Sequence, residues 1–194
     1  MGRPREFCVD MALDKALKVF WSKGYEGTSL TDLTEAMGIT RPSLYSAYGS
    51  KEELFRRALD RYGASHLGFV TDALAAATVR EAIERLLYGL ADAQTECDSP
   101  GGCMALNGAL VCSEEGDPIR RELIRRREQS RIALRERLEK ARAEGDLPDS
   151  TDTAKLALFI TAVANGMAVQ AASGVSREAL YGVVEVALTA WPSR

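Results

Sequence analysis

Apolar residues recur at helical spacing along almost the whole chain of 194 residues, and no other feature restricts its fold as strongly. Between Val9 and Phe20, for example, they fall mostly at steps of three and four and so line one face of a helix. Only 7% of the residues are aromatic, whereas Ala, Leu and Arg, which favour helices over sheets, recur throughout. We therefore predict an all-α fold.

Capping signals divide this pattern into about nine helices. Residues 29–32 and 50–53 form capping-box patterns that open a short second helix and a long fourth helix. Thr40 is placed to cap the third helix, and Pro42 lies in its first turn, where a missing backbone N–H costs nothing. After residue 62 we predict five longer helices, at 79–96, 103–112, 117–144, 152–173 and 176–191.

Composition narrows the class of protein. A charged fraction of 27% and a net charge of −3 are typical of an ordinary globular chain, and the first residues contain no apolar signal core. The most apolar stretch, 154–175, contains Lys155, Asn165 and Gln170 and falls short of a clean membrane span. The four cysteines form no C-x-x-C pair and His66 is the one histidine, which argues against a zinc site. We expect a cytoplasmic protein with no membrane partner, metal or cofactor.

Residues 29–48 carry the first indication of function. Two short helices flank the turn 37–39, in which Gly38 supplies the positive φ that such a turn usually needs. Packing the apolar side chains inwards leaves polar side chains of the second helix facing outwards. This is the layout of a helix-turn-helix, whose second helix enters the major groove of DNA. The same spacing also suits an ordinary αα-hairpin in a core, and the pattern by itself leaves both interpretations open.

The flanking segments favour the first interpretation. Gly-Tyr-Glu-Gly-Thr-Ser at 24–29 leads into the motif, and Tyr-Gly-Ser-Lys-Glu-Glu-Leu-Phe at 48–55 follows it. Together with Leu-Tyr-Ser-Ala-Tyr, these segments closely resemble the amino-terminal domain of the tetracycline-repressor (TetR) family of bacterial transcription regulators, over about residues 8–62. The resemblance implies a three-helix DNA-binding head within residues 1–62 and an effector-binding and dimerisation domain at 63–194.

The resemblance also implies which residues contact DNA. These are Thr28, Thr40, Arg41, Pro42, Ser43, Tyr45, Ser46, Tyr48 and Lys51. By resemblance, the start of the third helix faces base edges, while Thr28, Tyr45 and Lys51 hold phosphates. The chemistry agrees, because hydroxyls, lysine and helix amino-termini bind phosphate, and arginine pairs bidentately with guanine. Arg3 and Arg5 resemble a basic arm that lies along DNA; a loose terminus is the alternative interpretation.

Two Ala-rich apolar helices close the chain, and by resemblance the family dimerises there. Small residues let helices approach closely, so residues 152–191 suit half of a four-helix bundle between two subunits. A homodimer matches a palindromic operator in double-stranded DNA, since each subunit then reads one half-site. The alternative is that both helices are ordinary core. The helix at 117–144 holds ten Lys/Arg against five Asp/Glu, which suits either a second nucleic-acid surface or a solvated helix.

Residues 103–107 suggest how a signal reaches the protein. Cys103 is expected at a helix amino-terminus, where a thiol becomes more reactive, so it suits an electrophile or oxidant sensor with Cys97 or Cys112 as a resolving partner. A small buried hydrophobe is the alternative. For a small-molecule effector we predict a pocket lined by Leu87, Tyr88, Cys103, Met104, Asn107, Phe159, Val163 and Met167. The same side chains would serve equally as core.

These observations leave three classes of function. The first is a homodimeric, sequence-specific DNA-binding transcriptional regulator that represses and is released by a ligand. The second is an all-helical enzyme, against which stand the absence of metal-ligand spacing, of G-x-S-x-G and of a Gly-rich phosphate loop in the sequence. The third is a helical interaction or scaffold protein without ligand response. We expect the first, with no enzymatic activity.

Overall fold

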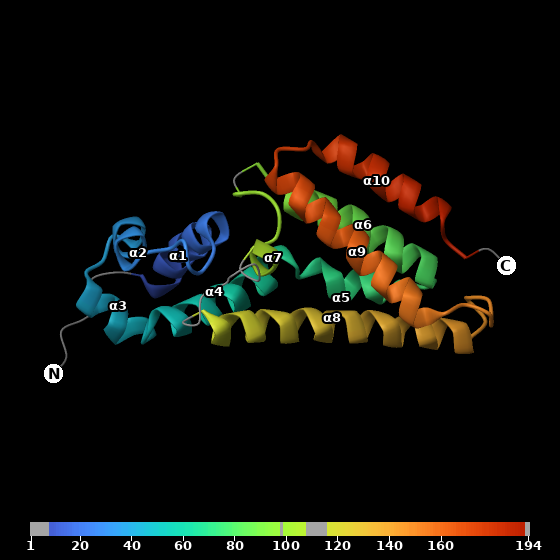
Figure 1. The fold of residues 1–194 in the computed structure, drawn as a ribbon, viewed down its shortest axis with the longest axis horizontal. Helices are drawn as coiled ribbons and strands as arrows, with labels where there is room; N and C mark the ends of the chain where they lie inside the picture. The colour runs from blue at the N-terminus through green and yellow to red at the C-terminus, as the bar shows by residue number, and fades with distance from the viewer. Residues whose placement is uncertain (1–7, 98, 108–115, 193–194) are drawn as a thin grey trace.

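The computed structural model describes residues 8–97, 99–107 and 116–192, which form ten α-helices and no strand (Figure 1). The predicted all-α fold is confirmed, with one helix more than predicted. The helices are α1 Val9–Lys23, α2 Leu30–Met37, α3 Arg41–Tyr48, α4 Lys51–His66, α5 Phe69–Leu74, α6 Val79–Gln94, α7 Met104–Asn107, α8 Asp117–Ala143, α9 Thr153–Ala172 and α10 Arg177–Thr189. We call α1–α4 the head and α5–α10 the body.

The predicted helix starts in the head are confirmed. The Ser29 side chain accepts the backbone N–H of Asp32, whose carboxylate accepts the N–H of Ser29 in return. Ser50 and Glu53 repeat this capping box at the start of α4. Gly38 adopts φ 68° at the end of α2, as the turn requires. These local bonds fix where each helix of the motif begins and ends.

The additional helix, α5, depends on tertiary contacts. Its Phe69 ring covers Gly89 of α6, where an added Cβ would lie 2.4 Å from the ring. Arg137 of α8 donates to the carbonyls of Leu74 and Ala76 and so satisfies the carboxyl end of α5. Six residues are too few to show a clear period. Of the predicted helix at 103–112, the structure describes α7 alone, and residues 108–112 lie outside the described residues.

Two hydrophobic clusters hold the molecule together, and α8 contributes to both. The head lies at one end of the elongated molecule, and α8 runs from beneath α4 along the length of the body (Figure 1). Near its start, Ile119 and Leu123 are buried in the head core. Further along, Leu134 and Leu138 are buried in the body core. Arg126, between these pairs, forms an ion pair with Asp60 of α4 at 2.7 Å.

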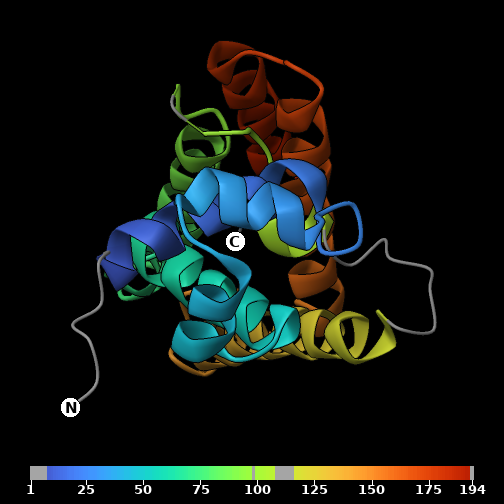
Figure 2. The same ribbon diagram turned by 90° about the vertical axis from the view of Figure 1, so that its left-hand side faces the viewer.

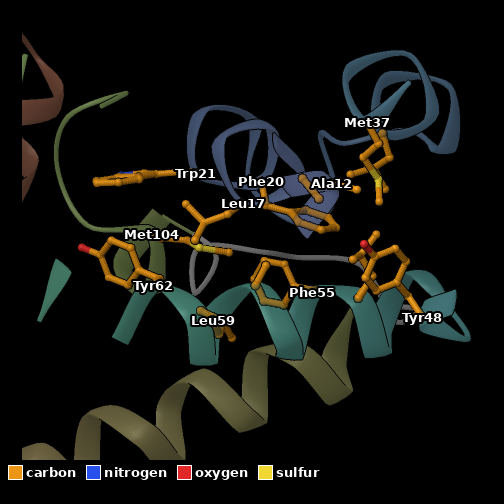
Figure 3. Close-up of a cluster of buried hydrophobic side chains, with 14 of the residues drawn as sticks. Ala12, Leu17, Phe20, Trp21, Met37, Tyr48, Phe55, Leu59, Tyr62 and Met104 are labelled. Atoms are coloured by element: carbon orange, nitrogen blue, oxygen red, sulfur yellow. The ribbon is translucent and has the colours of Figure 1, made fainter. Parts of the chain in front are cut away.

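The head core is completed by side chains from the body. Met104 of α7 lies with Trp21, Tyr62 and the rest of this cluster (Figure 3), and Ile119 and Leu123 join it from α8. All three body residues are at most 1% exposed. The core of the helices that carry the motif therefore extends beyond residue 62.

A fragment of residues 1–66 is expected to be largely unfolded at 25 °C. Each buried apolar side chain contributes about 1.5–3 kcal/mol, so the absence of three removes a large part of a typical stability of about 5–15 kcal/mol. Circular dichroism at 222 nm during thermal unfolding measures this, with the full chain as the control. A cooperative transition of the fragment within a few degrees of that of the full chain would contradict it.

Several arginines of α8 pair with carboxylates of the same helix. Glu122 pairs with Arg125 and with Arg126, four positions further on, and Glu128 pairs with Arg131. These contacts favour a solvated helix over a second nucleic-acid surface.

By length and composition, α9 is the one described helix that could cross a membrane. The sequence predicts no clean membrane span there, because the helix contains Lys155, Asn165 and Gln170. In this structure it packs against α6, α8 and α10.

Candidate nucleic-acid interface

The turn between α2 and α3 holds α3 with one face outward. Leu33 and Met37 of α2 and Leu44 of α3 are buried in the head core, and the Ile39 N–H donates to the Thr34 carbonyl across the turn. Because Leu44 anchors the inner face of α3, the opposite face lies at the surface. Helix α3 lies at the end of the molecule remote from α9 and α10, the end that is turned toward the viewer in Figure 2.

Five of the predicted contact residues are exposed at this surface. They are Thr40, Arg41, Pro42, Tyr45 and Ser46. Ser43 is half-buried, and its backbone N–H donates to the Thr40 hydroxyl, which caps α3. Tyr45 is 49% exposed, which is unusual for a large aromatic side chain in a small domain. The amino-terminal turn of α3 therefore faces solvent with an arginine and several hydroxyls.

Thr31 of α2 is a further member of this surface that the sequence analysis did not identify. It is exposed, and its hydroxyl accepts a hydrogen bond of 3.0 Å from the Arg41 guanidinium. The contact holds Arg41 beside the amino-terminal turn of α2. Sequence spacing gives no signal for it, because the two residues meet only once α2 and α3 have packed.

Lys51 lies in the first turn of α4, as predicted, and its ammonium nitrogen is 4.5 Å from the centre of the Tyr25 ring. Partial burial lowers the pKa of Lys51, and this effect is opposed by the nearby carboxylates of Glu26 and Asp32. Asp32 itself accepts a hydrogen bond from Lys23, which with the Ser29 capping box keeps the pKa of this carboxyl low. A half-buried ammonium on an aromatic ring is well placed to hold an anion at the surface.

Two predicted contact residues, Thr28 and Tyr48, are buried in the single chain, and their contact with DNA stays a prediction. Thr28 is 1% exposed and donates to the Gly24 carbonyl at 2.6 Å, while Ser29 caps α2. Tyr48 is fully buried, and its hydroxyl donates to the Val9 carbonyl at 2.6 Å. Tyr48 follows Leu44 by four residues, a spacing that places it on the inner face of α3. Arg3 and Arg5 lie outside the described residues.

The predicted effector-pocket residues fall into separate environments. Leu87 and Met167 are buried in the body core, with Tyr88 and Val163 packed against them. Cys103 and Met104 belong to the head core or its edge, and Phe159 is exposed. Of Asn107, only the backbone is described. The structure therefore does not bring the eight residues together.

Three cavities lined by described residues lie elsewhere, with volumes of about 300, 410 and 560 Å³. Of the predicted set, Phe159 alone lines one of these three.

Cys103 is half-buried immediately before α7, at the junction of head and body. Burial raises the pKa of the Tyr62 hydroxyl, and the neighbouring Cys103 thiol raises it further by a smaller amount. Cys97 is exposed, and Cys112 lies outside the described residues. The described residues include no cluster of His, Cys, Asp or Glu that would hold a metal ion.

Comparison with known proteins places these features in a family. Residues 12–58 match the model of the bacterial regulatory proteins of the tetR family, and residues 81–184 match that of the tetracyclin repressor-like C-terminal domain. The chain belongs to the TetR family. TetR-family proteins are soluble DNA-binding transcriptional regulators, not enzymes, and this chain has both of their domains.

Individual members resemble the chain over nearly its full length. It is 36% identical to the HTH-type transcriptional repressor ComR of Escherichia coli (strain K12), over 98% of this chain and 92% of ComR. A cysteine mutant of the regulator CifR, solved with 26-base-pair double-strand operator DNA, is 45% identical with a TM-score of 0.94, over 98% of this chain and 100% of CifR. A TetR regulator from Rhodococcus sp. RHA1 is 41% identical with a TM-score of 0.66, over 94% of this chain and 98% of the Rhodococcus chain.

Proposed function

We propose that this TetR-family regulator is a bacterial repressor that binds a palindromic operator as a homodimer and is released by a small-molecule effector. The observation that carries the proposal is the exposed amino-terminal turn of α3, where Arg41, Tyr45 and the Thr40 cap face solvent on a rigidly packed helix. This is the part of a helix-turn-helix that reads base edges in the major groove. Operator binding by CifR and repression by ComR are consistent with this role.

The dimer is inferred from an apolar face that α9 and α10 leave uncovered. Leu158 is 58% exposed and Val169 52%, and Val186 of α10 is 70% exposed. Between the first two, Ala162 and Gly166 are exposed small residues at helical spacing, and a Cβ at Gly166 would meet nothing within 4 Å. Such a face on two neighbouring helices of 20 and 13 residues suits a second copy of the same pair in a four-helix bundle.

For the effector we propose the body core around Leu87, Tyr88, Val163 and Met167; the proposal is supported by the burial of Leu87 and Met167 in this core, against which Tyr88 and Val163 pack. The Tyr88 ring packs edge-on against the Tyr181 ring, and the Tyr181 hydroxyl donates a hydrogen bond of 2.5 Å to the Asp92 carboxylate. Polar groups therefore lie at the rim of an apolar site. An effector here would shift the population toward a head spacing that does not fit the operator.

Selection from randomised duplex DNA at about 150 mM salt tests the DNA-binding part of the proposal, because such salt suppresses most nonspecific phosphate binding. We expect enrichment of an inverted repeat. The small-molecule fraction of a bacterial extract is then added to the bound duplex, and release is expected to be lost in Val163→Trp, which fills the site. Folded, dimeric protein that enriches no sequence with or without extract would favour the scaffold alternative.

Lys51→Gln is expected to weaken binding about equally on all duplexes and to lower the slope of log affinity against log salt by about 1 per subunit, because one phosphate contact is lost. Fluorescence anisotropy between about 50 and 200 mM salt measures the slope. Lys140→Gln, on an exposed lysine of α8 outside the proposed dimer face, is the matched control. An unchanged slope would remove Lys51 from the interface. Deletion of residues 1–5, which carry the proposed arm, is assessed by the same titration.

Thiol sensing through Cys103 is the second candidate, favoured by the position of this residue between head and body. In that case Cys103→Ser repressor remains on the operator when a thiol-alkylating electrophile such as N-ethylmaleimide is added, whereas the wild type is released. Cys97→Ser is the matched control for an exposed thiol. Release of Cys103→Ser at the wild-type dose would rule the sensor out.

A further inference from the structure

We propose that Met104 and the glycine turn before it position the head on the dimerisation helices, so that this short segment sets the separation of the two α3 helices in the dimer. Met104 is thus assigned as a positioning residue for operator recognition, which it influences without touching DNA. The inference rests on the proposed dimer and deepens it, since it identifies what makes the spacing of the two heads definite.

At one end, the segment is pressed against α9. Gly101 and Gly102 both adopt positive φ, 78° and 70°. A Cβ at Gly102 would lie 2.8 Å from the Ala168 carbonyl oxygen and 3.0 Å from the Ala172 Cβ, so only glycine allows this close approach. The Gly102 N–H also donates to the Gln94 carbonyl at the end of α6, at 2.9 Å. The turn is therefore fixed to both α6 and α9.

At the other end, the segment enters the head core. Met104 is 1% exposed and belongs to the same buried cluster as Trp21 of α1 and Tyr62 of α4 (Figure 3). As α7 packs against both α1 and α4, a displacement of Met104 acts on the two helices that support the motif.

The short distance between these two contacts gives the segment its role. Only Cys103 separates Gly102, which contacts α9, from Met104, which lies in the head core. The Cα atoms of residues two positions apart are at most about 7 Å from each other. The long helix α8 also touches both cores, but Leu123 and Leu134 are 11 positions apart, about 16 Å along the helix axis. Segment 102–104 is thus a much shorter connection than α8 between the head and the proposed dimer helix.

The test measures binding to duplexes in which the two half-sites of the selected inverted repeat are moved apart or together by one or two base pairs, each about 3.4 Å and 35°. The wild type is expected to prefer the native spacing by about tenfold or more over a shift of two base pairs. In Met104→Ala this preference is expected to fall to about twofold, because the heads lose their fixed position. Affinity for a single half-site stays unchanged, a result that mere destabilisation would not give.

Matched variants separate positioning from stability. Met37→Ala removes the same side chain from the head core at a site remote from the body, and it is expected to weaken binding equally at all spacings. Met104→Leu, which restores the apolar volume, is expected to recover the wild-type preference. Gly102→Ala, which pushes the turn off α9, is expected to reduce the preference, whereas Gly174→Ala has the same positive-φ strain but meets nothing within 4 Å and is expected to leave it unchanged.

Two results would overturn the inference. The first is a folded, dimeric Met104→Ala protein and a Gly102→Ala protein that both keep the wild-type spacing profile. Wild-type protein that binds the half-site equally well at every spacing would instead contradict dimeric recognition, and with it the inference that depends on it. Analytical ultracentrifugation of each variant, run beside the binding assay, distinguishes these two failures.

Discussion

Val186→Arg is expected to convert the dimer to monomers and thereby to abolish operator binding at nanomolar protein. In the single chain Val186 is 70% exposed, so an arginine there costs little. In the proposed bundle the same arginine would be buried without a partner, at about 3–5 kcal/mol for each of the two copies, or about 10⁴-fold or more in the dissociation constant. Sedimentation velocity across a concentration series measures the change.

Ile132→Arg is the matched control for this substitution. Ile132 is 44% exposed on α8, outside the α9 and α10 face, and we expect the variant to remain dimeric and to bind the operator normally. Monomers in both variants, or dimers in both, would show that the association surface lies elsewhere. Circular dichroism confirms that each variant keeps its helical content.

Arg41→Ala is expected to weaken operator binding by about 5- to 150-fold per half-site and to relax specificity at one base pair of each. A bidentate arginine–guanine pair contributes about 1–3 kcal/mol of discrimination, and Arg41 is exposed at the amino-terminal turn of α3, held by Thr31. Competition with duplexes that carry each base at each operator position measures both effects.

Arg41→Lys distinguishes base reading from a phosphate contact, because lysine keeps the charge but not the planar pair of donors. If Arg41 reads a base, the lysine variant loses specificity nearly as fully as the alanine variant. If it held a phosphate, lysine would restore most of the affinity. Arg80→Ala, an exposed body arginine paired with Glu84, is the control and is expected to leave binding unchanged.

The local parts of this structure were predictable from sequence. The starts of α2, α3 and α4 depend on hydroxyls and carboxylates within three residues of the atoms they bond, and the turn at Gly38 depends on one backbone conformation. The contacts of Arg41 with Thr31 and of Arg137 with the end of α5 were not predictable, because those residues are 10 and more than 60 positions apart.

The burial of Thr28 and Tyr48 at the candidate interface, which the sequence did not predict, has a related cause. A resemblance identifies positions, but it does not state which side of a helix each position faces. Tyr48 and Thr28 share the motif with Tyr45 and Arg41, yet their hydroxyls donate to backbone carbonyls inside the head. The effector set likewise combined residues of two cores, since Met104 shows the same apolar character as Leu87 and only the packing assigns each to its cluster.

The shared head core has a consequence for how such regulators diversify by recombination. A chimera that joins this head to the body of another regulator at residue 62 would put foreign side chains where Met104, Ile119 and Leu123 now pack. The exchangeable unit is therefore discontinuous in sequence: the amino-terminal helices together with α7 and the first turns of α8. Transplanting this set as a whole would transfer the DNA-reading surface with the packing that supports it.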